Sequence, residues 1–235
     1  GPGRGNRDCF GPQDLRRDTR RRASMMGKPY KLTKQTISRH VRVLCQQCDR
    51  MAHALDVAGM PPARDRKGGF CTLLRIIIDQ QISVHAGRAI WAKLENRLGN
   101  ITASRVLAVR EHTLRSCGLS VQKIRYAREL AMAIRSGDLD LAELYKLDDE
   151  RAVAQLTRVK GIGAWTAEIY LMFAMGRPDI MPAGDLALQI SAQNLMGLKE
   201  RPSIKELRGI AIRWAPYRTA AAIMLWQFYR KMPLK

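Results

Sequence analysis

A single carboxylate in a distinctive local context is the first candidate for chemistry. Asp185 follows Met181-Pro-Ala-Gly and precedes an apolar helical pattern that begins at Leu186. Aspartate is a favoured N-cap, so capping a helix is sufficient to explain it. The helix dipole also favours the ionised carboxylate, which suits the same residue to stabilise a developing positive charge. From these residues alone, both roles stay open.

A pair of glycines between two helical segments is the second candidate. The stretch Val159-Lys-Gly-Ile-Gly163 ends one apolar pattern, and the next begins at once at Ala164. Glycines allow a tight reversal and the close approach of another backbone. The first amides of the second helix then point outward at a positive dipole end, which suits one phosphate group. An ordinary helical hairpin with a glycine turn is the competing interpretation.

The charge of the chain indicates a polyanionic partner. The 235 residues carry 41 Lys and Arg against 21 Asp and Glu, a formal net charge of +20. Residues 1–28 hold eight of the basic and three of the acidic residues without periodicity, and we expect a flexible basic arm there. Met25-Met26 is a candidate for the natural start. The remaining chain still carries +15, and nucleic acid is the default partner, ahead of an anionic membrane or an acidic protein.

The pattern beyond residue 28 predicts an all-α protein of about ten short helices. Apolar spacing, cap residues and glycine stops place them at 33–57, 70–78, 83–99, 102–109, 111–116, 120–136, 141–144, 148–158, 164–175, 185–196, 203–214 and 217–229. No apolar stretch has the length of a membrane span, and we expect no membrane partner. The five cysteines include Cys45 and Cys48, which we expect to be ordinary positions of the first helix in an intracellular protein.

Five segments together resemble a known family. They are the hairpin continued through Trp165-Thr-Ala-Glu-Ile-Tyr, Met181-Pro-Ala-Gly-Asp-Leu-Ala-Leu, Ile78-Asp-Gln-Gln-Ile-Ser-Val, Gly118-Leu-Ser-Val-Gln-Lys123 and Trp214-Ala-Pro-Tyr-Arg-Thr-Ala-Ala. Over about residues 65–230 they resemble the helix–hairpin–helix DNA glycosylase superfamily, and within it the 3-methyladenine DNA glycosylase II branch. The resemblance implies a two-lobed helical bundle with a helix–hairpin–helix motif and a catalytic cleft between the lobes. One lobe would join residues 29–68 to about 181–235, and the other would hold about 69–180.

The resemblance implies a monofunctional DNA glycosylase of base excision repair. It would flip out alkylated purines of the 3-methyladenine type and hydrolyse their N-glycosidic bond, with Asp185 as the catalytic residue. Such a purine already carries positive charge and leaves without a general acid, so Glu168 is expected to be a surface or structural residue. A glycosylase for deaminated or etheno bases, or a non-catalytic DNA-damage-binding member, are the alternatives.

The same resemblance assigns side chains to base recognition. Trp165, Tyr217 and Trp214 would line the base pocket, where an aromatic face suits a cationic base. Core packing is the competing interpretation for each of them. Gln81, or failing that Ile82, would act as the wedge that fills the gap left by the flipped base. Two ordinary loop glutamines are the alternative for the turn that contains Gln81.

The partner implied is double-stranded DNA containing damaged bases, bound by a monomer that is intracellular and DNA-associated. Its contacts to the backbone are expected from Lys160, Gly161, Gly163, Ala164, Thr166, Lys123 and Arg218. The family hairpin also suggests a structural Na⁺ or K⁺ on three backbone carbonyls, which by position belong to Thr157, Val159 and Ile162.

No cofactor is expected to be required. The iron–sulfur cluster of related branches needs four cysteines near the C-terminus, and none follows Cys117. The bifunctional glycosylase–lyases carry a lysine nucleophile where this sequence has Trp165, so the resemblance implies an enzyme without AP-lyase activity.

Overall fold

The computed structural model describes residues 32–63 and 66–232, and every regular element within these ranges is a helix. The described residues form two compact units. Unit 1 joins the residues up to 63 with those from Gly176 onward, and unit 2 is Arg66–Met175. The basic arm expected at residues 1–28 lies outside the described residues. Across the described ranges, no helix is long and apolar enough to cross a bilayer.

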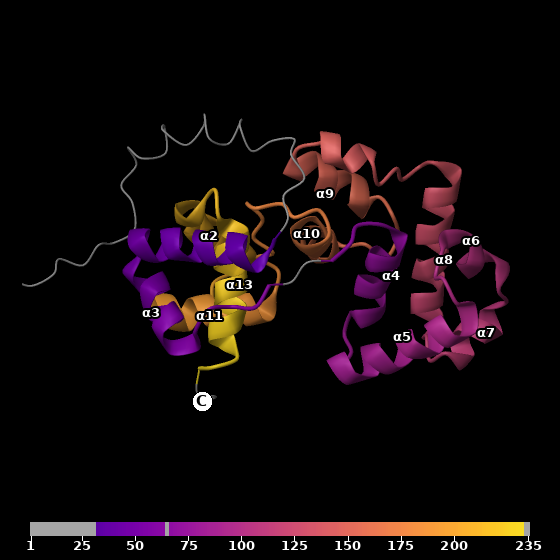
Figure 1. The fold of residues 1–235 in the computed structure, drawn as a ribbon, viewed down its shortest axis with the longest axis horizontal. Helices are drawn as coiled ribbons and strands as arrows, with labels where there is room; N and C mark the ends of the chain where they lie inside the picture. The colour runs from indigo at the N-terminus through magenta and orange to yellow at the C-terminus, as the bar shows by residue number, and fades with distance from the viewer. Residues whose placement is uncertain (1–31, 64–65, 233–235) are drawn as a thin grey trace, which may run out of the picture. The chain divides into compact units, whose positions relative to one another are not determined.

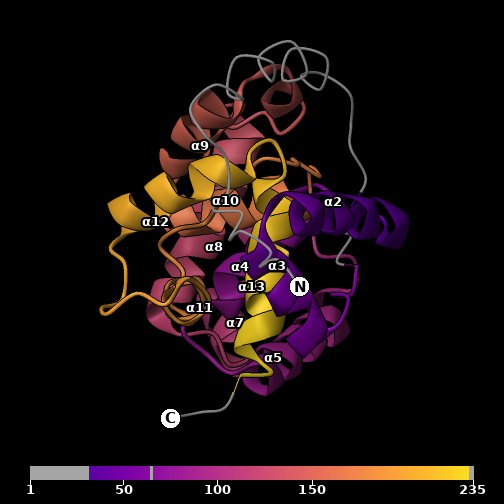
Figure 2. The same ribbon diagram turned by 90° about the vertical axis from the view of Figure 1, so that its left-hand side faces the viewer.

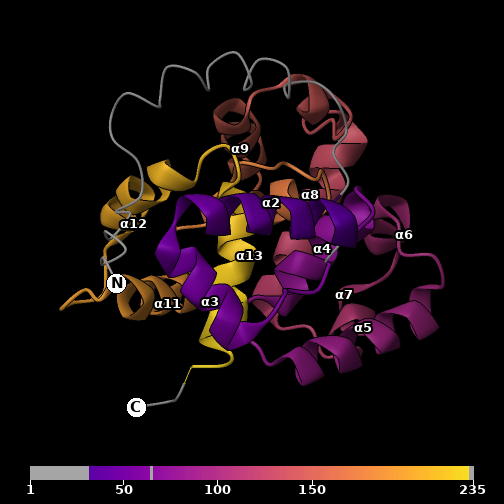
Figure 3. The ribbon, with the colours of Figure 1, turned by 60° about the vertical axis from the view of Figure 1, so that its left-hand side comes forward.

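Unit 1 is built around its last helix. Its elements are α2 (Lys34–Gln47), α3 (Asp49–Ala58), α11 (Leu186–Met196), α12 (Ile204–Ala211), the 3₁₀ helix η3 (Ile212–Trp214) and α13 (Arg218–Tyr229). Helix α13 contacts α2, α3 and α11 (Figure 1). Figures 2 and 3 show α11 and α12 on the same side of α13. Most residues of α13 are buried, because a helix that is apolar on nearly all faces needs neighbours around it.

The first predicted helix is in fact two helices. The pattern at 33–57 suggests one continuous element, but Cys48 has an extended backbone with φ −146° and ψ 110° and separates α2 from α3. Cys45 therefore does not share a helix with Cys48, and its thiol donates to the carbonyl oxygen of Met51 at 3.4 Å. In the part of the chain that the structure describes, no group of three or more His, Cys, Asp or Glu side chains is placed to hold a metal ion.

Unit 2 contains the hairpin and the turn of Gln80, Gln81 and Ile82, which is called the wedge turn below after its predicted role. Its elements are α4 (Phe70–Asp79), α5 (Val84–Leu98), α6 (Ala103–Ala108), α7 (Glu111–Ser116), α8 (Val121–Ser136), the 3₁₀ helix η2 (Glu143–Lys146), α9 (Asp149–Thr157) and α10 (Ala164–Phe173). Helix α4 contacts α5, α8 and α10 (Figure 1). Tyr170 of α10 is 1% exposed, its hydroxyl accepts from the Gly69 amide at 2.9 Å, and burial raises the pKa of its phenol to about 12.

Local cap signals locate most helix starts correctly. The side chains of Ser83, Thr102 and Ser120 each accept a hydrogen bond from the amide three residues later, at 3.1, 3.3 and 3.2 Å. Such a bond satisfies one of the amides that a helix start leaves unpaired. The structure departs from expectation at 203–214, where α12 ends at Ala211 and η3 follows. The short element expected at 141–144 is η2, two residues later.

His40 makes the stability of unit 1 depend on pH. Its side chain is 2% exposed, and burial, assisted by the charge of Arg39, lowers its pKa from 6.5 to about 4. The unfolded chain takes up this proton below about pH 6.5, whereas the folded chain does so only near pH 4. Stability is therefore lost as pH falls through this window, and at about pH 5 the loss should be about 2 kcal/mol.

We predict that His40→Gln removes this contribution. Urea unfolding of both proteins at about pH 7 and about pH 5 measures it as the difference between their two pH-dependent losses. Equal losses in the two proteins would show that another group titrates in this window.

Candidate functional site

The turn between α9 and α10 requires the first glycine of the pair. The Ile162 amide donates to the Val159 carbonyl at 3.0 Å, and Gly161 has φ +96°. A type II turn needs a positive φ at its third position, which glycine adopts without strain. A Cβ on Gly161 would also lie 2.3 Å from Cγ of Tyr126 in α8. The turn conformation and the close approach of α8 both exclude a side chain here.

The second glycine leaves the start of α10 open. Gly163 is the N-cap, and the amides of Ala164, Trp165 and Thr166 precede the first intrahelical hydrogen bond, from Ala167 to Gly163 at 3.0 Å. Gly163 and Ala164 are exposed, and a Cβ on Gly163 would meet no atom within 4 Å. This helix end therefore offers amides and a positive dipole to an anion that approaches it.

Gln80 joins the predicted wedge turn to the hairpin. Its side-chain amide donates to the Gly161 carbonyl at 3.1 Å and to the Thr166 hydroxyl at 2.8 Å. Thr166 is 2% exposed and its hydroxyl is bound to Gln80, so its side chain is not available for the expected phosphate contact. The sequence placed Gln80 in the right turn but did not indicate this role, since its partners lie 81 and 86 residues away.

The next residue is held in a rarely used conformation. Gln81 has φ +55°, which makes it the one described non-glycine residue with a positive φ, and it is exposed. Strained backbone of this kind persists only where the surroundings fix it. Ile82, the second wedge candidate, is half-buried. The geometry thus presents Gln81 outward from a turn whose neighbour Gln80 is bound to the hairpin.

Lys123 is bound to the wedge turn. Its ammonium group donates to the Ile78 carbonyl and, at 2.9 Å, to the Gln80 carbonyl, at the C-terminal end of α4. Partial burial lowers its pKa, against the opposing effect of Asp79. Two of the three donors of this ammonium group are thus used inside unit 2, and the expected contact between Lys123 and DNA stays a prediction. By contrast, Lys160 is exposed on the hairpin turn.

Asp185 is held by two donors in unit 1. As the N-cap of α11, its Oδ1 accepts from the Leu188 amide at 3.1 Å and from the indole Nε1 of Trp226 at 3.1 Å. The Gln189 side chain donates to the Ala183 carbonyl at 2.8 Å and fixes the loop before the carboxylate. The predicted cap is confirmed, and the side chain is half-buried. No local signal in the sequence indicates the bond from Trp226, which lies 41 residues further along the chain.

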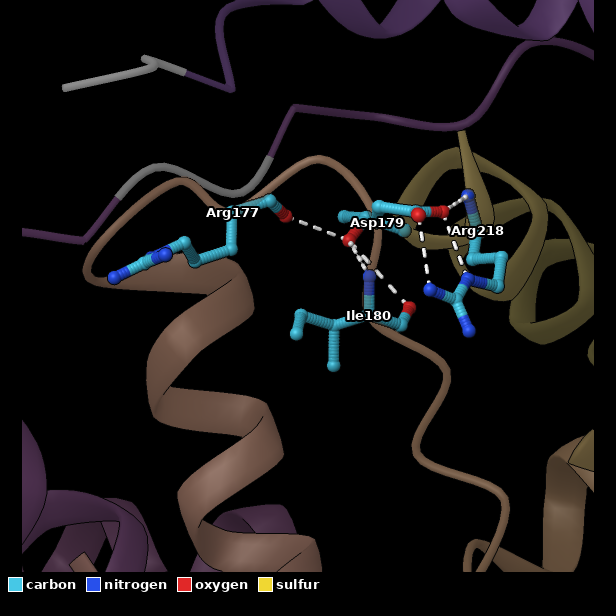
Figure 4. A network of polar contacts seen from close by, with 5 residues as sticks. Arg177, Asp179, Ile180 and Arg218 are labelled. Carbon is cyan, nitrogen blue, oxygen red and sulfur yellow. Dashed lines mark hydrogen bonds and ion pairs between the residues drawn. The ribbon is translucent and has the colours of Figure 1, made fainter. Parts of the chain in front are cut away.

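Arg218 is paired within unit 1. Its guanidinium makes two hydrogen bonds to the Asp179 carboxylate, at 2.8 and 2.9 Å, and its backbone amide adds a third at 3.2 Å (Figure 4). Thr219 donates to the Arg177 carbonyl at 2.7 Å and accepts from the Ile180 amide at 3.1 Å. These bonds attach the loop before Asp185 to the start of α13. The structure therefore gives Arg218 a positioning role, and its expected phosphate contact stays a prediction.

The aromatic candidates divide by burial. Trp214 is 1% exposed, so its ring belongs to the core of unit 1 and offers no face to a base, contrary to expectation. Tyr217 is half-buried, and its ring centroid lies 4.4 Å from that of His40. Trp165, on the first turn of α10, is also half-buried. Glu168 is 8% exposed, which fits a structural residue and excludes the surface position.

The hairpin supplies oxygens that could hold a monovalent cation. Thr157 is the last residue of α9, and the carbonyls of Val159 and Ile162 belong to the turn that follows. The Val159 carbonyl accepts one hydrogen bond from the Ile162 amide and keeps its second lone pair. Neutral carbonyl oxygens are the ligand type that Na⁺ and K⁺ take, so the residues fit the expected ion.

Comparison with known proteins places these features in a family. Residues 74–216 match the model of the HhH-GPD superfamily base excision DNA repair proteins. The chain belongs to this family. It is 32% identical over 167 residues to a protein of Schizosaccharomyces pombe named DNA-3-methyladenine glycosylase 1, with 69% of this chain and 73% of that protein covered.

Solved structures agree with the family. A DNA-3-methyladenine glycosidase from Bacillus halodurans has a TM-score of 0.72 at 33% identity, over 81% of this chain and 88% of that chain. A 3-methyladenine DNA glycosylase of Schizosaccharomyces pombe, solved in complex with abasic DNA, has a TM-score of 0.71 at 29% identity, over 80% and 95%.

We expect substitutions of the two lysines near the hairpin to have different effects on the free energy of unfolding. Lys123→Met leaves the Ile78 and Gln80 carbonyls without their donor and should lower the free energy of unfolding by about 1–3 kcal/mol. Lys160→Met changes an exposed side chain and should stay within about 0.5 kcal/mol of the unmodified chain. Urea unfolding at neutral pH measures both. Equal stabilities of the two variants would show that Lys123 does not support the wedge turn.

Proposed function

We propose that this chain is a monofunctional DNA glycosylase that removes alkylated purines of the 3-methyladenine type. The observation that carries the proposal is Asp185, a carboxylate fixed at the start of α11 by the Leu188 amide and the Trp226 indole. It occurs in a chain of the HhH-GPD family whose relatives are named for 3-methyladenine. Two donors on one oxygen hold the side chain in a single orientation, as electrostatic catalysis requires.

The chemistry needs only one carboxylate. Cleavage of the N-glycosidic bond develops positive charge on the sugar, and an ionised Asp185 stabilises that charge. The same carboxylate can orient the attacking water or accept its proton. An alkylated purine already carries positive charge and departs as a neutral base, so no acid is required to protonate it. This explains why a buried Glu168 is not needed as a catalytic partner.

The hairpin is the proposed contact to the DNA backbone. The open amides at the start of α10 would hold one phosphate, and the exposed Lys160 would add a charge that does not depend on base sequence. Gln81 would enter the gap left by the flipped base, because it is exposed beside Gln80, which is bound to the hairpin. A Na⁺ or K⁺ on the hairpin carbonyls would strengthen the turn and takes no part in the chemistry.

The absence of lyase activity is proposed from residue identity. A glycosylase–lyase uses an amine that attacks the sugar, and the corresponding position here is Trp165, which has none. Among the nearby lysines, Lys123 is bound to two backbone carbonyls, and Lys160 lies on the hairpin turn.

The central test is base release by the unmodified chain and by Asp185→Asn. The amide keeps the size of the side chain but loses the negative charge, so release of free 3-methyladenine from methylated duplex DNA should fall by at least about 100-fold. Chromatography of the released bases measures it. Binding to DNA with an abasic-site analogue should persist in the variant and serves as the control.

The outcomes separate the alternatives. No release of any base by the unmodified chain would contradict the proposal and favour a non-catalytic member that binds damaged DNA. Release of hypoxanthine or ethenoadenine in preference to 3-methyladenine, from a panel of defined lesion duplexes, would retain the chemistry and change the substrate class.

Lys160→Ala should weaken binding to all DNA sequences by a similar factor. Because one phosphate contact is lost, the slope of log binding constant against log salt concentration should flatten by about 0.9. Fluorescence anisotropy on two unrelated duplexes at several salt concentrations measures this. A loss confined to one of the duplexes would contradict a backbone contact.

The lyase proposal predicts intact strands. After base release from a lesion duplex, the abasic strand should break only when alkali or heat is applied, and borohydride should trap no covalent complex, because no amine forms a Schiff base. Denaturing gels with and without alkali measure this. Strand cleavage without alkali would show that another amine replaces the lysine missing at Trp165.

A further inference from the structure

A charged pocket in unit 2 is not used by the hairpin or by Asp185. It lies where α4 meets α5 and has a volume of about 410 Å³. The side chains that matter here are Arg66, Arg75, Arg88, Asp79, Trp91 and Cys71, and all of them belong to unit 2. Ile82, the second wedge candidate, forms part of the same wall.

The pocket has a net positive charge and guanidinium donors that are available to a ligand. Three guanidinium groups face one carboxylate, since Arg75 pairs with Asp79 at 3.0 Å. Arg66 and Arg88 are exposed, and neither forms an ion pair with any residue that the structure describes. Two unpaired guanidiniums beside one pocket are suited to a phosphate group, which they can bind through paired hydrogen bonds.

The pocket also contains a fixed aromatic ring. The indole Nε1 of Trp91 donates to the Glu95 carboxylate at 2.7 Å, and the guanidinium carbon of Arg75 lies 5.0 Å from the ring centroid. Trp91 is half-buried, so its orientation is set before any ligand arrives. Indole and guanidinium planes are the surfaces on which proteins stack unpaired bases. A volume near 400 Å³ falls in the range of small-molecule sites and exceeds what a phosphate alone fills.

One acceptor in the wall lacks a donor. Oδ1 of Asp79 is buried and has no hydrogen-bond partner in the structure, whereas Oδ2 is bound to Arg75. Gly87 of α5 makes room for it, because a Cβ there would lie 2.2 Å from this oxygen. A carboxylate whose Oδ1 is enclosed against α5 and whose Oδ2 binds Arg75 is held in one position in the pocket wall.

We propose that this pocket binds one unpaired nucleotide of DNA. Its base would stack beside Trp91 and Arg75, and Arg66 and Arg88 would hold its phosphate. The proposal rests on DNA as the partner in the proposed function, but it does not depend on catalysis by Asp185. Unit 2 would then have a site that recognises unpaired DNA beside the wedge turn.

The first measurement compares two undamaged duplexes of equal length, one fully paired and one with a single bulged nucleotide. In fluorescence anisotropy, the unmodified chain should prefer the bulged duplex by at least about fivefold, the effect of stacking one base. Trp91→Leu should lose this preference. Arg88→Ala should weaken binding of the bulged duplex, whereas Arg97→Ala, an exposed arginine of the same helix outside the pocket, should not.

The second measurement uses the exposed thiol in the wall. Cys71 is exposed, whereas Cys45 lies in unit 1 and is half-buried. Iodoacetamide labelling, mapped on peptides, should show that the bulged duplex protects Cys71 more than the paired duplex does, with Cys45 unaffected. Equal protection by inorganic phosphate alone would reduce the pocket to an anion site and overturn the nucleotide proposal.

Equal binding of the two duplexes by the unmodified chain, or a preference that survives in both Trp91→Leu and Arg88→Ala, would likewise overturn it. Asp185→Asn should keep the preference for the bulged duplex. A chain that releases no base but prefers the bulged duplex would therefore contradict the proposed function while supporting this one.

Discussion

The arrangement of unit 2 depends on the absence of a side chain at Gly161. Its φ of +96° closes the turn between α9 and α10, and Tyr126 of α8 occupies the space in which a Cβ would lie. Because this turn is fixed against α8, its Gly161 carbonyl lies in reach of Gln80. The wedge turn therefore takes its position from the hairpin, and Lys123 of α8 completes the arrangement by binding the Gln80 carbonyl. A contact to DNA at the hairpin would act on a segment that already holds the wedge turn in place.

Asp185 combines the observed role of a helix cap with the proposed role in catalysis. Asp185 caps α11 and thereby satisfies the Leu188 amide, which stabilises the helix start. The same bond, with the one from Trp226, holds the carboxylate in one orientation. Capping and the proposed chemistry do not compete here, since both need a fixed side chain.

The net charge of +20 indicates a polyanionic partner but does not identify the contacts. Two of the cations expected to meet DNA are used within the fold: Lys123 binds backbone carbonyls, and Arg218 binds Asp179. Two others that the sequence did not single out, Arg66 and Arg88, lie exposed at a pocket with Trp91. Positive residues divide between the interior network and the surface according to which acceptors the fold brings near them.

The sequence alone is enough to predict the helical class, most helix starts and the glycine turn of the hairpin. These features depend on neighbours within a few residues, such as the bond from the Ala86 amide to Ser83, and such signals are legible in the chain. It also identified Asp185, because its Pro-Ala-Gly context is local and its surrounding segments resemble a family. The sequence did not predict the break between α2 and α3 at Cys48, since the apolar spacing continues across it.

The partners of the polar side chains, by contrast, follow from the packing of distant segments. Trp226 reaches Asp185 from 41 residues away, and Arg218 reaches Asp179 from 39. The packing of unit 1 likewise determines that the ring of Trp214 is buried. Periodicity places a residue on a face of its own helix, but the packing of distant helices determines what that face meets, and hydrogen bonds follow from that meeting.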